Sequence, residues 1–234
     1  MSDQRTDPGF VREQYRSEAG LSARASIWHP TADGLTPQDV VLSRLREQGP
    51  ENVLEVGCGT GALAARIADE LQVPVTGVDQ SARMVELTSG RGVKAVIGDA
   101  CDLPFDDVAF DAVVAAWMLY HVADLDRALA QVRRVLRPGG LFVAVTNGDD
   151  HIADLLAAAG QQKIRTQFSS ENGESALRRH FEQVTAQHLH TRAFADHEQA
   201  SRYLSSSDRH AGATLPPYDG VREFTGAVTV FTAR

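Results

Sequence analysis

The sequence is poor in cysteines, in long apolar runs and in basic residues, and each shortage excludes a class of protein. Its two cysteines, Cys58 and Cys101, belong to no CxxC pair, which argues against a disulfide scaffold and against a zinc site. No apolar run approaches the roughly 18 residues that cross a bilayer, and the polar opening MSDQRTDPGF contains no signal-peptide core. These absences predict a soluble, cytoplasmic protein with no membrane partner.

Acidic residues outnumber basic ones, and the formal net charge is −8. Surfaces that bind nucleic acids are usually basic, so a nucleic-acid partner is not expected. The tightest basic group is formed by Arg133, Arg134 and Arg137, just before Pro138-Gly139-Gly140. We interpret this group as the last turn of a helix, where cations complement the helix dipole. An RNA contact is the alternative interpretation.

Strand and helix patterns alternate between residues 50 and 147. The chain length and a hydrophobic content of 43% allow one substantial core, and hence one domain. Alternation at this spacing predicts a parallel sheet with right-handed crossovers and helices on both faces. The expected strands span 52–56, 74–79, 93–99, 110–117 and 141–147, and the expected helices span 61–71, 81–89 and 124–136.

The alternation breaks down after about residue 148. A helical run over 149–159 is followed by an extended run over 184–195, a helical run over 196–207 and a closing strand over 221–233. A long strand, a helix and a final strand predict an antiparallel hairpin that completes the sheet. Near the N-terminus, a helical pattern over 38–48 is expected to pack outside the sheet.

A glycine-rich turn follows the first expected strand, in the motif VLEVGCGTG. Gly57, Gly59 and Gly61 form GxGxG, which differs from the GxGxxG of dinucleotide-binding proteins. This pattern discriminates weakly by itself, because a tight turn that binds no ligand would also show it. Asp79 ends the second strand about 20 residues further on, where a carboxylate can accept both ribose hydroxyls. Asp99 ends the third strand, where it can accept from an adenine amino group. Together these strand ends predict a nucleoside site.

In this combination the chain resembles the class I S-adenosylmethionine-dependent methyltransferases. The branch it resembles most contains quinone-biosynthesis and natural-product tailoring enzymes that act on small molecules. The resemblance covers roughly residues 50–147 and implies a Rossmann-like α/β fold. That fold is a seven-stranded, mostly parallel sheet with helices on both faces and the last strand antiparallel. The matching pieces are VLEVGCGTG, VTGVD with Ser81 and Met84 after it, GDACDLPF, FDAVVAAWMLYHV and RRVLRPGGLFVAV.

The resemblance also implies a division of the single domain over 1–234. Residues 1–50 would form a helical lid, 51–147 the cofactor-binding core, and 148–234 a small substrate cap with the closing antiparallel strands. Residues 9–29 of this lid would fold over cofactor and acceptor and exclude water from the transfer site. The alternative is that they form an amphipathic helix that only packs on the sheet.

The family's cofactor is S-adenosylmethionine, and its product is S-adenosylhomocysteine. This ligand has no pyrophosphate, so the glycines would permit close backbone approach, and acidic side chains suit its sulfonium and ammonium charges. The implied contacts are Glu55, Gly57, Gly59 and Gly61 at the methionine part, Asp79 at the ribose, Gln80 and Met84 beside the adenine, Asp99 and Ala100 at its amino edge, Ala116 and Trp117 beside the methionine amino group, and Tyr15 in the lid.

Methyl transfer to nitrogen or oxygen is an in-line displacement, which the protein assists by alignment and by excluding water. A hydroxyl or ammonium acceptor also needs a proton acceptor. His121, beside Tyr120 after the fourth strand, is the first candidate. The alternative is that His121 only packs against or caps the next helix. Tyr15, His29 and His151 are further candidates, and no metal site is expected.

The expected function is methyl transfer to a small-molecule substrate by a monomer or homodimer. Three alternatives remain open at this point: a methyltransferase that acts on RNA or protein, a non-catalytic S-adenosylmethionine-binding protein, and a nicotinamide-dependent oxidoreductase. The oxidoreductase fits less well, because the third glycine of the motif, Gly61, stands one position early for a dinucleotide turn.

Overall fold

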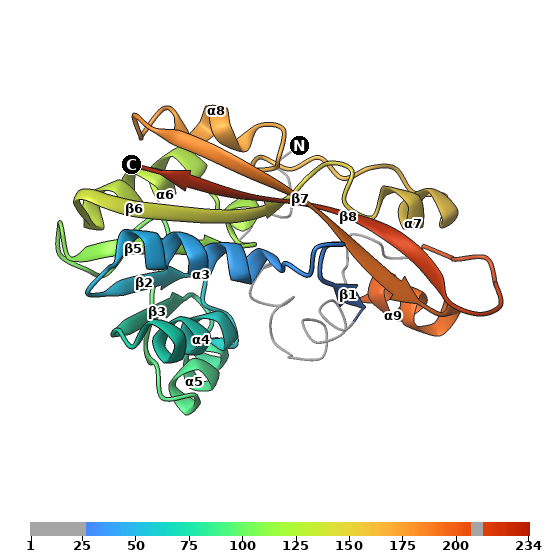
Figure 1. Cartoon of the computed structure of the whole chain (residues 1–234), viewed down its shortest axis with the longest axis horizontal. Helices are drawn as coiled ribbons and strands as arrows, with labels where there is room; N and C mark the ends of the chain where they lie inside the picture. The colour runs from blue at the N-terminus through green and yellow to red at the C-terminus, as the bar shows by residue number, and fades with distance from the viewer. Residues whose placement is uncertain (1–26, 207–212) are drawn as a thin grey trace.

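The computed structural model describes residues 27–206 and 213–234, and within these ranges eight strands form one sheet (Figure 1). Their order across the sheet is β1-β7-β8-β6-β5-β2-β3-β4. The strands span Trp28–His29 (β1), Val53–Val56 (β2), Val75–Asp79 (β3), Lys94–Ile97 (β4), Phe110–Ala116 (β5), Leu136–Asn147 (β6), Val184–Ala195 (β7) and Arg222–Ala233 (β8).

The predicted sheet is confirmed in its arrangement, with one addition. Strands β2 to β6 pair in parallel, and the closing strand β8 lies antiparallel between β6 and β7. The addition is β1, which pairs antiparallel with β7 through Trp28 and Ala193. A strand of two residues is too short to show alternation, so the sequence pattern does not reveal it. The expected helical lid over 1–50 is therefore wrong at Trp28–His29, and its residues up to 26 lie outside the described residues.

Helices cover both faces of the sheet, as predicted. Buried residues of α3 and α4, including Val41, Leu45 and Ile67, pack on one face. Residues of α6 and α8, including Leu129 and Leu177, pack on the other. The helices span Pro37–Gln48 (α3), Ala62–Leu71 (α4), Ala82–Gly90 (α5), Leu125–Val135 (α6), Ala153–Ala158 (α7), Gly173–Leu177 (α8) and His197–Ser205 (α9), with a 3₁₀ turn at Leu119–His121 (η2).

The β7–β8 hairpin extends well beyond its neighbours, and its far end carries α7 and α9 (Figure 1). A separate apolar cluster forms there, with Leu155, Tyr203, Leu204 and Phe224 packed around Ile27. The N-terminal part of the described chain is therefore attached to the hairpin as well as to the parallel core.

The arginines near the end of α6 are held by the protein itself. The Arg134 guanidinium donates to the Leu103 and Phe105 carbonyls and pairs with Asp107. The helix ends at Val135, so Arg137 lies in β6 and not in the last helical turn as expected. Its guanidinium pairs with Asp111 at 2.6 Å. These contacts account for Arg134 and Arg137 without an RNA partner.

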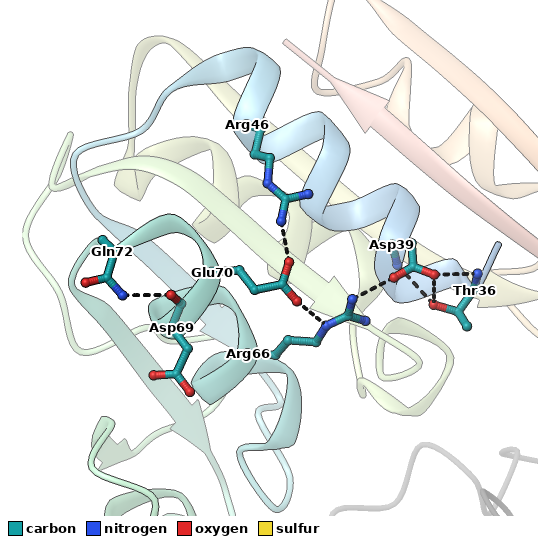
Figure 2. Close-up of polar contacts among 7 residues, drawn as sticks. All are labelled: Thr36, Asp39, Arg46, Arg66, Asp69, Glu70 and Gln72. Atoms are coloured by element: carbon teal, nitrogen blue, oxygen red, sulfur yellow. Dashed lines mark hydrogen bonds and ion pairs between the residues drawn. The ribbon is translucent and has the colours of Figure 1, made fainter. Parts of the chain in front are cut away.

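A polar network joins α3 to α4 beside the glycine-rich turn (Figure 2). Arg66 pairs with Asp39 at 2.6 Å and with Glu70 at 2.7 Å, and Arg46 also pairs with Glu70. The Thr36 hydroxyl and then the Arg66 guanidinium lower the pKa of Asp39 to about 2. Thr36 and Asp39 also form a capping box at the start of α3. Exposed ion pairs stabilise little individually, but this network fixes where α3 begins.

Among the described residues, no helix has the length and apolar character needed to cross a membrane.

Candidate functional site

A pocket of about 840 Å³ lies where the parallel strands end at their carboxyl edge. Such edges are where open α/β sheets bind their ligands. The volume is near the upper end of the roughly 300–1,000 Å³ usual for small-molecule sites. Most of the residues predicted as a site line this one pocket: Glu55, Gly57, Gly59, Asp79, Gln80, Met84, Asp99, Ala100, Ala116, Trp117, Tyr120 and His121.

Two predicted residues are not among those that line the pocket. Tyr15 lies outside the described residues. Gly61 is absent from the pocket wall because it packs inward: a Cβ there would lie 2.7 Å from the Thr88 backbone. Its backbone φ of +74° also favours glycine. Gly61 therefore serves the close contact between two segments of the core, and the structure does not place it with the other predicted residues.

Gly57 and Gly59 differ in what surrounds them, although both have positive φ angles. A Cβ on Gly57 would lie 2.8 Å from the Met118 side chain, so this glycine permits a close packing contact. A Cβ on Gly59, whose φ is +53°, would meet no heavy atom within 4 Å. Gly59 is therefore the position of the motif where a ligand can approach the backbone.

Asp79 stands at the end of β3 and holds the glycine-rich turn in place. Its Oδ2 accepts from the Gly59 N–H at 3.0 Å, and its Oδ1 accepts from the Ser81 N–H at 2.9 Å. Burial raises the pKa of Asp79, and these backbone donors partly offset the rise. Each carboxylate oxygen has two lone pairs, so both can still accept from a ligand hydroxyl.

Glu55 is the most deeply buried carboxyl group of the site, with 3% of its surface exposed. Its Oε2 makes no hydrogen bond to any part of the chain that the structure describes. Burial raises its pKa to about 8, despite an opposing backbone hydrogen bond from Ala64. A buried acceptor without a donor usually marks an absent partner. Glu55 is therefore suited to a cationic ligand group.

Asp99 and Ala100 follow β4 at the pocket margin. Asp99 is largely exposed, and its Oδ1 accepts from the Cys101 N–H at 2.8 Å. Gln80 and Met84 lie beside the end of β3, where the Ser81 hydroxyl caps α5 by accepting from the Met84 N–H.

Trp117 follows directly after β5 and has a positive φ of 55°, which is uncommon for an aromatic residue. Its backbone N–H donates to the Val145 carbonyl at 2.8 Å, and its indole Nε1 donates to Asn147 Oδ1 at 3.0 Å. Asn147 ends β6 at the same edge of the sheet. Sequence reasoning missed Asn147, although the rule that found Asp79 and Asp99 applies equally to this strand end.

Three of the candidate histidines line the pocket, at different depths. His121 belongs to η2, and its ring lies 4.6 Å from that of Tyr120. His29 is exposed, whereas His151 is partly buried and stacks on the Trp28 indole at 4.6 Å. No group of three metal-binding side chains occurs over residues 27–206 and 213–234.

Trp28, Thr191 and Tyr203 also line the pocket, and sequence reasoning identified none of them as site residues. They come from β1, β7 and α9, which are distant in sequence from the glycine-rich motif. No local pattern signals them, because the β7–β8 hairpin alone brings them to this edge of the sheet.

Comparison with known proteins agrees with the fold and with the motif. Residues 54–144 match the family model described as a methyltransferase domain. The chain is 36% identical over 160 residues to an O-methyltransferase, cnsE, of Penicillium expansum, covering 64% of this chain and 56% of the relative. It is 39% identical over 110 residues to a 27-O-demethylrifamycin SV methyltransferase of Amycolatopsis mediterranei, covering 44% and 40%. The chain thus spans about half the length of these curated relatives.

Among solved structures, the [4+2]-cyclase SpnF superposes with a TM-score of 0.62 at 20% identity, over 96% of this chain and 94% of that one. A likeness at this identity establishes the fold and leaves the reaction to be argued from the site.

Proposed function

Because residues 54–144 form a methyltransferase domain within a class I fold, we propose that this chain transfers a methyl group from S-adenosylmethionine to a small-molecule acceptor. The observation that carries the proposal is the joint placement of Glu55, Gly59 and Asp79 around one pocket. The names of the relatives, both of which are O-methyltransferases, favour oxygen over nitrogen as the methylated atom.

The residues of the pocket fit this cofactor chemically. Glu55 Oε2, which lacks a donor from the described chain, would accept from the ammonium of the methionine part. Gly59 would allow close backbone approach, and Asp79 would accept from the ribose hydroxyls. Gln80, Met84, Asp99 and Ala100 would surround the adenine. When bound, S-adenosylmethionine supplies a methyl group carried on a positively charged sulfur.

The protein's own part in the reaction is to align the acceptor with the methyl group and to exclude water. Ala116 and Trp117 would border the methionine amino group, and the Asn147 amide fixes the Trp117 ring. His121 remains the proton acceptor predicted from the sequence, with Tyr120 beside it. Both line the pocket, which is the placement that this role requires.

The direct test is calorimetric titration with S-adenosylhomocysteine and, separately, with NADH. We expect one saturable site for S-adenosylhomocysteine and no measurable binding of NADH. Binding of NADH alone would overturn the proposal in favour of an oxidoreductase. If S-adenosylhomocysteine binds but no methyl transfer is detected across a panel of hydroxylated metabolites, the chain is a non-catalytic binding protein.

Proton release should accompany cofactor binding at Glu55. The pKa of Glu55 is raised to about 8, so its carboxyl group is mostly protonated at pH 7 before the ligand binds. A ligand ammonium favours the charged carboxylate. S-adenosylhomocysteine binding at pH 6–7 is thus expected to release about one proton per site. Calorimetry in buffers of different ionisation enthalpy measures this number.

The variant Glu55→Gln, which has no proton to release, should bind with a heat that is independent of the buffer. Glu47→Gln is the matched control, because Glu47 lies on the exposed side of α3 away from the pocket. A wild-type protein that binds without proton release would mean that the ammonium lies elsewhere.

A further inference from the structure

The pocket extends beyond the residues assigned to the cofactor, toward the β7–β8 hairpin. On this side it is lined by Trp28, His151, Thr191, Tyr203 and Val228. These side chains include no carboxylate, ammonium or guanidinium group. The walls are largely aromatic, since the Trp28 ring lies edge to face with that of Tyr203 at 6.2 Å. We call these five residues the hairpin compartment.

His151 presents a defined hydrogen-bond acceptor to this compartment. Its Nδ1 lies 3.2 Å from the Ala227 carbonyl oxygen. A carbonyl can only accept, so Nδ1 carries the proton and Nε2 keeps its lone pair. Among the described residues, the contact with Ala227 is the one hydrogen bond of this ring, so none of them donates to Nε2. Stacking on Trp28, with 27° between the two planes, fixes the orientation of the ring.

The imidazole is uncharged at neutral pH. Burial lowers the pKa of His151 to about 4, and the hydrogen bond to Ala227 offsets only part of that change. The hairpin compartment therefore offers a neutral acceptor and no counter-charge for an ionic ligand.

Thr191 carries a second polar group, which is buried. Only 4% of the surface of Thr191 is exposed, and its Oγ1 has no hydrogen-bond partner in the described parts of the chain. Gly226 on β8 makes room for this arrangement, because a Cβ there would lie 2.1 Å from Thr191 Oγ1 and 2.4 Å from the Trp28 ring. The hydroxyl therefore packs against Gly226 and adds no accessible polar atom to the compartment.

From these observations we infer that the hairpin compartment binds the methyl acceptor, and that the acceptor is a planar, uncharged hydroxyarene whose hydroxyl donates to His151 Nε2, so that His151 and not His121 accepts from the hydroxyl. The inference rests on the proposed function for the cofactor half of the pocket. It adds the chemical class of the acceptor and assigns Trp28 and His151 to its recognition. Aromatic walls suit a flat ring, and the lack of a charged side chain among these five described residues disfavours carboxylates and sulfonates.

The test uses the whole chain saturated with S-adenosylhomocysteine and 2-naphthol as the probe. We expect saturable calorimetric binding of 2-naphthol, and binding at least tenfold weaker for naphthalene, which lacks the hydroxyl, and for naphthalene-2-sulfonate, which is charged. Trimethylphenylammonium tests the alternative that the aromatic walls bind a cation. Stronger binding of the sulfonate or of the ammonium compound than of 2-naphthol would overturn the inference.

Variants of His151 test the hydrogen bond itself. Asn at this position keeps a donor for the Ala227 carbonyl but has no acceptor at Nε2, so His151→Asn should weaken 2-naphthol binding by at least tenfold. His151→Gln, whose longer amide reaches the Nε2 position, should recover part of it. His188→Asn is the matched control, since His188 lies on β7 outside the pocket and bonds to Thr229. Unchanged affinity in His151→Asn would contradict the assignment.

The location of the probe can be read from fluorescence, because the chain has two tryptophans and both line the pocket. In the Trp117→Phe variant the remaining emission comes from Trp28, and 2-naphthol should quench it in saturable fashion. If S-adenosylhomocysteine binds but 2-naphthol neither binds nor quenches, this inference fails while the proposed function stands. If S-adenosylhomocysteine does not bind, the proposed function fails first.

Discussion

Replacing Gly59 with valine is expected to abolish S-adenosylhomocysteine binding in a chain that still folds. A Cβ at this position meets no protein atom within 4 Å, so the added side chain projects into the open pocket and occupies ligand space. The φ of +53° makes the substitution strained by about 1–2 kcal/mol. We expect the affinity for S-adenosylhomocysteine to fall by at least about 100-fold, which is roughly 2.7 kcal/mol. Calorimetry measures the binding, and urea denaturation measures the stability.

Gly61 gives the matched comparison within the same motif. A Cβ there would lie 2.7 Å from the Thr88 backbone, at a φ of +74°. Overpacking and backbone strain then act together, so Gly61→Val should lower the free energy of unfolding by about 3–5 kcal/mol. Equal effects of the two substitutions on stability, or retained binding in Gly59→Val, would contradict the division between a ligand-facing and a packing glycine.

Replacing Asp79 with alanine is expected to weaken S-adenosylhomocysteine binding by about 2–3 kcal/mol, or about 30- to 150-fold. The carboxylate would accept two ribose hydroxyls in charge-assisted bonds. It also accepts from the N–H groups of Gly59 and Ser81, so the variant should also loosen the glycine-rich turn. The loss of these two backbone hydrogen bonds should lower the free energy of unfolding by about 1–2 kcal/mol.

Asp79→Asn separates the two roles of this residue. Asparagine keeps one acceptor oxygen for the turn but has no charge and only half of the acceptor capacity. Its stability should therefore lie nearer to the wild type, while its affinity for S-adenosylhomocysteine remains low. If Asp79→Ala binds as tightly as the wild type, the ribose is held elsewhere in the pocket.

The variants Gly59→Val and Asp79→Ala also probe the hairpin compartment. Neither residue contributes to its walls. Both variants should consequently keep part of their 2-naphthol binding even where S-adenosylhomocysteine binding is lost.

The sequence alone determined most of the sheet and the half of the pocket that we propose binds the cofactor. Apolar runs of strand length, bounded by helical patterns, predicted which segments are strands and that they form a parallel sheet with right-handed crossovers. The rule that parallel strands present ligand groups at their carboxyl ends then predicted a shared site for Asp79 and Asp99, and the family resemblance added Glu55. These signals are local, so each can be read within a few residues of the chain.

Only the tertiary structure decided the other half of the pocket and the separate roles of the glycines. The contact of Trp28 with His151, the place of Thr191 beside Gly226 and the clash that Gly61 avoids at Thr88 all join segments distant in sequence. The protonated nitrogen of His151 is likewise set by a carbonyl on β8. Such features depend on which atoms of remote segments come within a few ångströms of one another, and hydrophobic periodicity carries no information about that.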